Sequence, residues 1–336
     1  MQTVARTALV AWYGSFEDGG TIGDLLAMRS VVTRLLAEGH AVSHASAHDV
    51  EVAGSRRVDL NSARPDDFDG LVFVCGPIIR GHPQTQALFE RFAAIPKLGV
   101  AVSLFPSGHA NYADPFDRVL PREGRAPAFE DVAIAAPPDA AVAARSDPRF
   151  TVGIALRGPQ TEYEPEHCLA ERTSEIVREA ARELAARPGG RVVEIENHLQ
   201  RSGIAPAAIE SRYAACDLVI TSRFHGAMLA LRHGVPFVAV DQIEGGAKVS
   251  ALIGATGWPH VYRAEAADAA ALVSAAEDVL SGRLDRHMAD ITRDTIGRAR
   301  ATLDAAAALV RGLEISSRPS APSRPRAAAS PTDPLR

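Results

Sequence analysis

The sequence predicts an α/β protein of two Rossmann-like lobes, each built on a parallel sheet, with a cleft between the lobes. Three observations favour this fold. Short apolar runs alternate with helical segments, which is typical of doubly wound sheets. The alternation occurs twice, before and after a proline-rich stretch. The length of 336 residues also suits two domains of ordinary size.

The first half of the chain opens with an apolar run at 7–13, which we interpret as a strand. The glycine-rich loop 14–23 leads from it into a helix that extends from about Asp24 to Glu38. Apolar side chains recur at helical spacing in this segment, and Gly39 ends it. The other elements expected in this half are strands at 41–45, 70–76 and 98–104 and a helix at 84–92.

The stretch 105–149 contains prolines at seven positions and shows no clear apolar period. Proline removes a backbone donor and interrupts regular structure. We therefore expect an irregular, loop-rich crossover that ends in an interdomain linker at 136–149.

The second half repeats the pattern of the first. A new first strand is expected at 151–156, and it ends at Arg157. The elements that should follow are an amphipathic helix at 166–187, a strand at 191–195 and a helix at 206–215.

Residues 217–252 are the most informative part of the chain. An apolar run over 217–222 ends in Thr and Ser and indicates a buried strand; a short helix, a Gly-Val-Pro turn and a second apolar run follow. In open α/β sheets, ligands bind in the crevice outside the carboxyl ends of the strands. Polar side chains lie just beyond both strands, so we predict a site around Arg223, His225, Asp241 and Lys248.

The segments after Ala264 are rich in alanine and should be helical to about Leu313. From Glu314 the composition changes to Ser, Pro, Ala and Arg, which cannot bury enough apolar surface to order itself. We therefore expect a first lobe at 1–149, a second lobe at 150–313 and a disordered tail at 314–336. Two such lobes with a cleft between them form the GT-B architecture of many sugar-nucleotide enzymes.

Composition excludes several classes of protein. The net charge of -5 argues against a nucleic-acid-binding protein, which usually carries a basic stripe. No apolar stretch reaches the roughly 20 residues that a membrane helix needs. The three cysteines are widely spaced and form no CxxC pair, which indicates a reducing, cytoplasmic location and no zinc site. We expect no metal ion. The sequence is compatible with a homo-oligomer.

Lysine is rare in this chain. Of the 36 cationic residues, only Lys97 and Lys248 are lysine. An ammonium is a compact point charge, whereas a guanidinium is a wide fork. Lys248 therefore stands out as a position at which arginine would not serve, although chance is also a fair explanation for two residues.

The stretch from Asp217 to Asp241, with Lys248 after it, resembles the polysaccharide pyruvyl transferase family. In that family an Arg-x-His-Gly element follows a buried strand, as Arg223 to Gly226 do here. The loop Gly19 to Asp24 is similar to the family's Gly-Asp loop, and the strand that ends at Arg157 is similar to its Ser-Leu-Arg strand. The family's frequent Arg-Asp-x-x-Ser segment is not evident in 105–149.

This resemblance implies transfer of the pyruvyl group of phosphoenolpyruvate onto two hydroxyls of a sugar or glycan acceptor, which gives a cyclic ketal and phosphate. The second lobe would then hold the donor and the first lobe the acceptor. No cofactor is implied. The residues implied are His225 as the acid and Asp24 as the group that acts on the acceptor, with Arg157, Arg223, Lys248, Gly226 and Gly23 binding substrate.

Each of these residues also has a simpler structural reading. His225 and Asp24 could cap helices, Arg223 could form a surface salt bridge, and Lys248 could be solvated. A different enzyme class also stays open: a GT-B glycosyltransferase or epimerase that uses a nucleotide sugar, with Glu244 as the acidic residue that holds the ribose. A third reading is a non-catalytic binding protein on the same scaffold.

Overall fold

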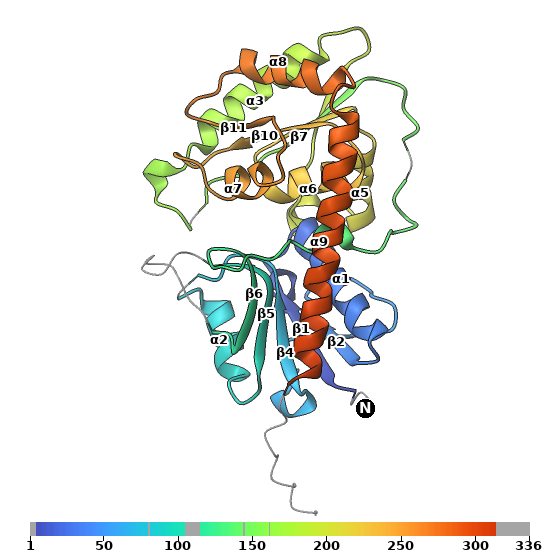
Figure 1. The fold of residues 1–336 in the computed structure, drawn as a ribbon, viewed down its shortest axis with the longest axis vertical. Coiled ribbons are helices and arrows are strands. Elements are labelled where there is room, and N and C mark those ends of the chain that lie inside the picture. Colours follow the sequence, from blue (N-terminus) through green and yellow to red (C-terminus); the bar gives the residue numbers. More distant parts are fainter. Residues whose placement is uncertain (1–4, 80, 105–114, 144, 161, 314–336) are drawn as a thin grey trace, which may run out of the picture.

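The computed structural model describes residues 5–79, 81–104, 115–143, 145–160 and 162–313. These residues form two α/β lobes stacked along the long axis of the molecule (Figure 1). The predicted fold class, two parallel-sheet lobes of GT-B type, is confirmed. The expected tail 314–336 lies outside the described residues.

The first lobe is built on a six-stranded sheet in the order β3-β2-β1-β4-β5-β6. All of its neighbouring strands are parallel. Its inner strands are buried almost throughout, as expected for strands with both faces covered. The strands are β1 (Thr7–Trp12), β2 (Ala41–Ala45), β3 (Arg56–Val58), β4 (Gly70–Val74), β5 (Lys97–Ser103) and β6 (Arg118–Glu123).

Helix α1 (Ile22–Ala37) packs on one face of this sheet, and its N-terminus lies at the carboxyl end of β1. Eleven of its residues are buried, including Leu25, Met28 and Val32, which confirms the helical spacing seen in the sequence. Helix α2 (Pro83–Arg91) buries Leu88 and Phe89 and connects β4 to β5.

Strand β6 corrects the prediction that 105–149 is irregular. It pairs with β5 in parallel at the edge of the sheet. Pro121 lies inside it, and an edge strand tolerates proline because one side of its backbone needs no ladder partner. The proline signal therefore hid a strand. A short 3-10 turn, η3 (Ala133–Ala135), follows and packs against α1.

The second lobe is built on a five-stranded sheet in the order β11-β10-β9-β7-β8, again with every pair parallel. Its strands are β7 (Thr151–Ala155), β8 (Arg191–Glu194), β9 (Leu218–Thr221), β10 (Phe237–Asp241) and β11 (Val261–Arg263). Its helices are α3 (Ala170–Ala185), α4 (Leu199–Ser202), α5 (Pro206–Ala214), α6 (Phe224–Arg232), α7 (Lys248–Gly254) and α8 (Ala269–Leu280).

The predicted strand, helix, strand unit at 217–241 is present as β9, α6 and β10. The expected helix at 166–187 begins later, at Ala170, because Pro165 to His167 form a separate 3-10 turn. Three short elements were not predicted: β3, α4 and β11 have three or four residues each, too few for a period to show.

The last helix, α9 (Asp285–Arg311), crosses from the second lobe to the first (Figure 1). Its later turns pack against α1, η3, β5 and β6. Arg298 pairs with Glu130 at 2.9 Å, and Arg311 pairs with Glu38 on α1. The expectation that 150–313 is one lobe therefore differs from the packing, since α9 belongs to the core of both lobes.

Both sheets reverse their direction of winding at a single place. In the first lobe the reversal lies between β1 and β4, and in the second between β7 and β9. Ligands bind beside such switch points in α/β folds. Tyr13 and Gly76, which follow β1 and β4, line the same cavity as Arg157 and Ser222, which follow β7 and β9. The two switch points thus face each other across the cleft.

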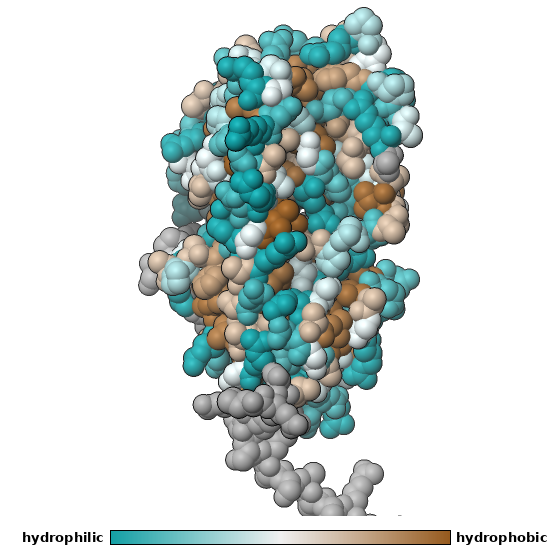
Figure 2. Space-filling view, turned by 45° about the vertical axis from the view of Figure 1, so that its right-hand side comes forward, coloured by the Kyte–Doolittle hydropathy of each residue, from teal (hydrophilic) through white to brown (hydrophobic). Residues whose placement is uncertain are grey.

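No helix among the described residues combines the length and the apolarity that a bilayer crossing requires. The face in Figure 2 shows hydrophobic residues in separate patches among hydrophilic ones.

Candidate active site between the lobes

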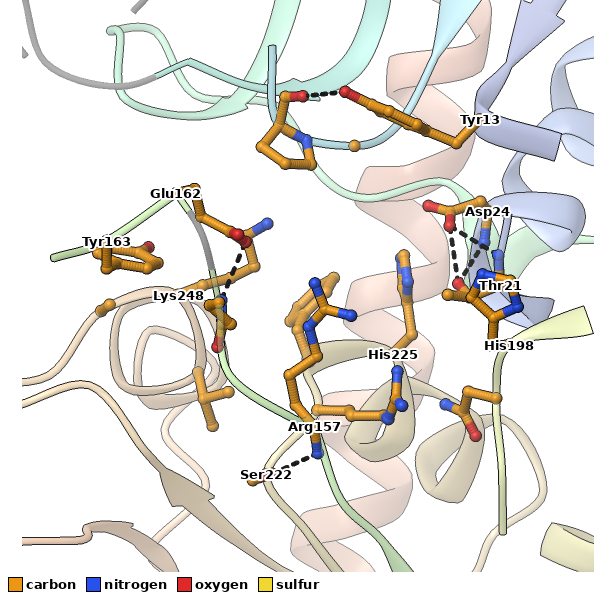
Figure 3. A pocket seen from close by; sticks show the side chains of 18 of the residues that line it. Tyr13, Thr21, Asp24, Arg157, Glu162, Tyr163, His198, Ser222, His225 and Lys248 are labelled. Carbon is orange, nitrogen blue, oxygen red and sulfur yellow. Dashed lines mark hydrogen bonds between the residues drawn. The ribbon is translucent and has the colours of Figure 1, made fainter. Parts of the chain in front are cut away.

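A cavity of about 460 Å³ lies between the lobes, at the carboxyl ends of both sheets. Its second-lobe wall carries cationic side chains together with Glu162, Tyr163 and Asp241. Its first-lobe wall carries Tyr13, Asp24 and Arg122, and Figure 3 labels several of these residues. Of the eight residues predicted for the site, six line this cavity: Asp24, Arg157, Arg223, His225, Asp241 and Lys248.

Arg157 and Arg223 stand together at the second-lobe switch point. Ser222, at the end of β9, accepts the backbone N–H of Arg157 at 2.8 Å and joins the two strand ends. Arg223 is held by Leu156 O at 2.7 Å and by Glu196 at 3.1 Å. The guanidinium of Arg157 has no hydrogen bond or ion pair within the described part of the chain. The alternative reading, in which Arg223 forms a surface salt bridge, does not describe its pair with Glu196, because the Arg223 side chain is only 9% exposed.

Burial lowers the pKa of Arg223, Glu196 opposes this effect, and the positive charge of Arg157 lowers the pKa further. The two guanidinium groups therefore repel each other. Only Arg223 is paired with a carboxylate in the described residues, that of Glu196. An anion in the cavity would relieve this repulsion, and guanidinium forks match carboxylate and phosphate oxygens.

His225 is the second residue of α6, and Arg223 rather than His225 is the N-cap of this helix. The ring therefore does not cap the helix and is directed into the cavity, between Arg157 and Asp24 in Figure 3. Its Nε2 lies 3.2 Å from Oδ2 of Asp131 and 3.4 Å from a guanidinium nitrogen of Arg122. The ring is thus held by side chains from the other lobe.

The two predicted glycines, Gly23 and Gly226, do not line this cavity. A Cβ on Gly23 would lie 2.5 Å from Cβ of His225 and closer still to its ring. A Cβ on Gly226 would lie 3.0 Å from Cβ of Thr221, which ends β9. Both glycines therefore permit close approach: Gly23 lets the His225 ring rest against α1, and Gly226 lets α6 start directly on the sheet.

Asp24 is a helix-capping residue that also lines the cavity. It forms a capping box with Thr21, since its Oδ2 accepts the Thr21 N–H at 3.0 Å and the Thr21 hydroxyl at 2.7 Å. It also lines the cavity on the wall opposite Arg157 (Figure 3). The cap fixes the position of this carboxylate, which is 8% exposed.

Lys248 is the first residue of α7, and its ammonium lies 3.4 Å from Glu123 at the end of β6. Burial lowers the pKa of Lys248, while Glu123 raises it in part. Asp241 shapes this helix start, because its Oδ2 accepts the N–H groups of Ala247 and Ser250 at 2.7 Å each. The predicted site residue Asp241 therefore positions Lys248.

Sequence reasoning missed Arg122 and Asp131. Both side chains are buried, at 3% and 1% exposure, and they form an ion pair beside His225. Arg122 comes after the short apolar run of β6, much as Arg157 comes after β7. This position could have marked Arg122 as a site residue, but the neighbouring prolines made the run look like a loop. Asp131 lies in a loop, and nothing in its spacing marks it.

A seam between the lobes closes one side of the cavity. The glycine-rich loop of the first lobe meets the segment before α4: Ile22 donates to Asn197 O at 2.8 Å, and Leu199 donates to Gly20 O at 3.2 Å. His198 contacts Asp18 O at 3.1 Å. The loop therefore serves as a contact between lobes and as a wall of the cavity.

Within the described residues, the ligand atoms of Asp24, Cys75 and His225 lie within 4.8 Å of one another, which is close enough for them to bind one metal ion. Burial raises the pKa of Cys75 well above its usual value, and a metal ligand must be the thiolate. The guanidinium of Arg122 also lies 3.9 Å from this sulfur. The arrangement is better suited to an anion than to a metal ion.

Residues 131–242 match the family model of polysaccharide pyruvyl transferase. The predicted resemblance is therefore confirmed over this stretch. The matched stretch includes Asp131, Arg157, Arg223 and His225, and it stops before Lys248. No curated protein matches the sequence.

Solved structures show the same fold at low sequence identity. A putative UDP-N-acetylglucosamine 2-epimerase from Listeria monocytogenes is 15% identical, with a TM-score of 0.57 over 94% of this chain and 99% of that chain. The spinosyn rhamnosyltransferase SpnG is 14% identical, with a TM-score of 0.50 over 91% of this chain and 99% of that chain. These similarities establish the GT-B architecture and leave the reaction to the site.

Proposed function

We propose that this protein is a pyruvyl transferase that moves the pyruvyl group of phosphoenolpyruvate onto two hydroxyls of a sugar acceptor and releases phosphate. One observation carries the proposal: Arg157, without an ion-pair partner in the described residues, stands beside Arg223 in a cavity that also holds His225. The family match over 131–242 agrees with it.

Phosphoenolpyruvate carries a carboxylate and a phosphate on a three-carbon frame. Arg157 and Arg223 supply two forks that suit these groups, and the start of α6 adds backbone N–H groups and a favourable dipole. Lys248 enters from the other side of the cavity as a point charge for phosphate. The donor thus lies against the second lobe.

The chemistry begins with protonation of the methylene carbon of phosphoenolpyruvate by His225, which leaves positive charge on the carbon that bears the phosphate. A first sugar hydroxyl adds to that carbon and loses its proton. Phosphate then leaves, a second hydroxyl closes the ring, and the proton of this hydroxyl passes to the released phosphate. Donor and diol together yield the ketal and one phosphate, so no oxidant, metal or organic cofactor enters the scheme.

The acceptor would occupy the first-lobe side of the cavity, where Asp24 and the Tyr13 ring lie (Figure 3). Asp24 would orient one acceptor hydroxyl and take its proton. Its capping bonds keep the carboxylate in place before the acceptor binds. We also propose a cytoplasmic location, because phosphoenolpyruvate is a metabolite of that compartment.

The geometry gives less support to the nucleotide-sugar reading. Glu244, its candidate for holding a ribose, does not line the cavity and pairs with His167 at 2.9 Å on the surface. That reading retains the fold similarity to the epimerase and rhamnosyltransferase, which is shared by many chemistries.

Two measurements test the proposal. Phosphoenolpyruvate should raise the melting temperature of the full chain, whereas UDP and GDP should not. Mass spectrometry of sugars and glycans incubated with the protein and phosphoenolpyruvate should then find the added pyruvyl mass and free phosphate. Stabilisation by UDP or GDP alone would favour a glycosyltransferase or epimerase instead.

A further inference from the structure

We propose that Asp131, held in place by Arg122, is the positioning residue of His225: it accepts the Nε2–H and thereby fixes the orientation and the Nε2–H tautomer of the ring. The inference rests on the proposed function for the role of His225. Its physical content, the orientation and tautomer of one ring, can be measured without any substrate.

The contact joins two lobes that are distant in sequence. Asp131 follows β6 in the first lobe, and His225 opens α6 in the second. Oδ2 of Asp131 lies 3.2 Å from Nε2 of His225, and the Asp131 side chain is fully buried. A buried carboxylate at this distance accepts an N–H strongly and orients the ring that bears it.

Asp131 is itself fixed from two sides. Its Oδ1 accepts the backbone N–H of Ala133 at 2.8 Å, and its Oδ2 accepts from the guanidinium of Arg122. Burial alone would raise the pKa of Asp131, but the charges of His225 and Arg122 outweigh burial and hold it well below the usual value. The carboxylate is therefore ionised throughout the neutral range.

Arg122 is clamped in turn. Ser103 Oγ, on β5, accepts from its Nε at 3.1 Å and from its NH2 at 2.8 Å, and the guanidinium lies 5.2 Å from the centre of the Phe224 ring. Phe224 precedes His225 on α6. Arg122 thus holds the Asp131 carboxylate and also contacts the start of α6, the helix that carries His225.

The tautomer follows from the contacts of Nε2. This nitrogen lies 3.2 Å from the Asp131 carboxylate and 3.4 Å from a guanidinium nitrogen of Arg122. A ring nitrogen bears either a proton or a lone pair, so only one contact is a hydrogen bond at a time. The shorter contact to a negative group favours the proton on Nε2. Nδ1 has no hydrogen bond within the described residues and lies on the side of the ring that rests against Gly23, where an added Cβ would collide with it.

Other charged and titratable groups also face this ring. Ligand atoms of Asp24 on α1 and Cys75 after β4 lie within 4.8 Å of a ring nitrogen, and Lys248 on α7, which pairs with Glu123 at the end of β6, lines the same cavity. Of the carboxylates around the ring, Asp131 is the one hydrogen-bonded to the imidazole in the described structure. Replacing Asp131 should therefore change the orientation and tautomer of His225 more than replacing any of the other groups.

The first test is nuclear magnetic resonance of the full chain with labelled histidine, in which His225 is assigned from the spectrum that loses it. Neutral His225 should be mainly the Nε2–H tautomer. A neutral ring protonated mainly on Nδ1 overturns the proposal without any variant at Asp131.

The second test is Asp131→Asn, which keeps the shape of the side chain and removes its charge. The Nε2–H tautomer of His225 should lose its preference in the histidine spectrum, because its negatively charged acceptor at 3.2 Å is lost. Turnover should fall about 100-fold while the KM for phosphoenolpyruvate changes less than about threefold, and Asp131→Glu should restore part of the turnover. A tautomer ratio that is unchanged in Asp131→Asn overturns the proposal.

Glu130→Gln is the matched control, since Glu130 is adjacent but pairs with Arg298 on α9. Its Oε1 accepts the backbone N–H of Asp131 at 3.2 Å, and the amide oxygen of glutamine can keep this bond. The control should leave both the His225 tautomer ratio and the turnover unchanged. The readouts also separate this inference from the proposed reaction. If Asp131→Asn changes the tautomer ratio but no sugar gains a pyruvyl group, the positioning role stands and the pyruvyl transfer falls.

Discussion

The substitution Gly23→Ala tests whether the His225 ring must rest directly on α1. The new Cβ would lie 2.5 Å from Cβ of His225 and nearer to the ring. Ordinary contacts between carbon atoms are about 3.5 to 4.0 Å, so the ring or the helix must move by about 1 Å or more. Gly23 belongs to the first turn of α1, which the Thr21 and Asp24 capping box fixes, so the ring should move first.

Two magnitudes follow from this shift. Overpacking of this kind costs about 1 to 3 kcal/mol of stability. A displacement of about 1 Å in a reacting group costs about 100-fold in turnover. The loss of turnover should exceed what the loss of folded protein explains, because the chain stays folded under assay conditions while the acid is out of place.

The assay pairs chemical unfolding with release of phosphate from phosphoenolpyruvate in the presence of an active sugar acceptor. Gly297→Ala is the matched control: Gly297 is also a helical glycine, exposed on α9, with nothing within 4 Å of its added Cβ. It should stabilise the protein by about 0.5 to 1 kcal/mol and leave turnover unchanged. If Gly23→Ala turns over within about threefold of the original, the close contact with His225 is not needed for the reaction.

Three further predictions concern the charges of the site. Arg157→Ala should raise the KM for phosphoenolpyruvate about 10- to 100-fold and the KM for the sugar less. Arg178→Ala, which breaks an exposed pair with Glu194, is the control and should change neither KM. Equal effects of the two substitutions would refute an anion site at Arg157. Lys248→Arg should weaken donor binding about 10-fold in the same kinetic assay, because the wider guanidinium needs more room than the ammonium at this mostly buried position beside Glu123. Lys97→Arg is the control, and equal kinetics for both would show that Lys248 persists by chance. Asp131 has a lowered pKa in the folded protein, so the stability it contributes is present above its unfolded pKa of about 3.9 and is lost as pH falls toward the folded value. The loss of unfolding free energy caused by Asp131→Asn, measured with urea, should therefore shrink from pH 6 to pH 3. A loss that is the same at both pH values would contradict this.

The sequence predicted the parts of the fold in which local pattern and tertiary structure agree. The apolar runs of β1, β4, β7 and β9 are buried strands, as expected from their composition. Since all parallel strands of a sheet end at one edge, the polar residues after β7 and β9 could be placed at a site before any coordinates were known.

The parts that were missed depend on contacts that local pattern does not encode. Pro121 suggested a loop, and only the position of β6 at the sheet edge makes it acceptable in a strand. The role of Asp131 exists because the fold brings two lobes together, which no spacing along the chain reveals. The sequence predicted that Gly23 binds substrate. In the structure, glycine is required at this position because a Cβ would collide with the His225 ring.

The path of α9 has a consequence for biosynthesis. The first lobe begins the chain, yet its helix α1 is covered in part by residues of α9, and Arg6 donates to Leu313 O at 2.7 Å. During translation, the nascent first lobe therefore keeps an uncovered apolar flank until α9 has left the ribosome. Any truncation before Asp285 leaves that flank bare, so early stop codons should yield aggregating fragments rather than an independent amino-terminal domain.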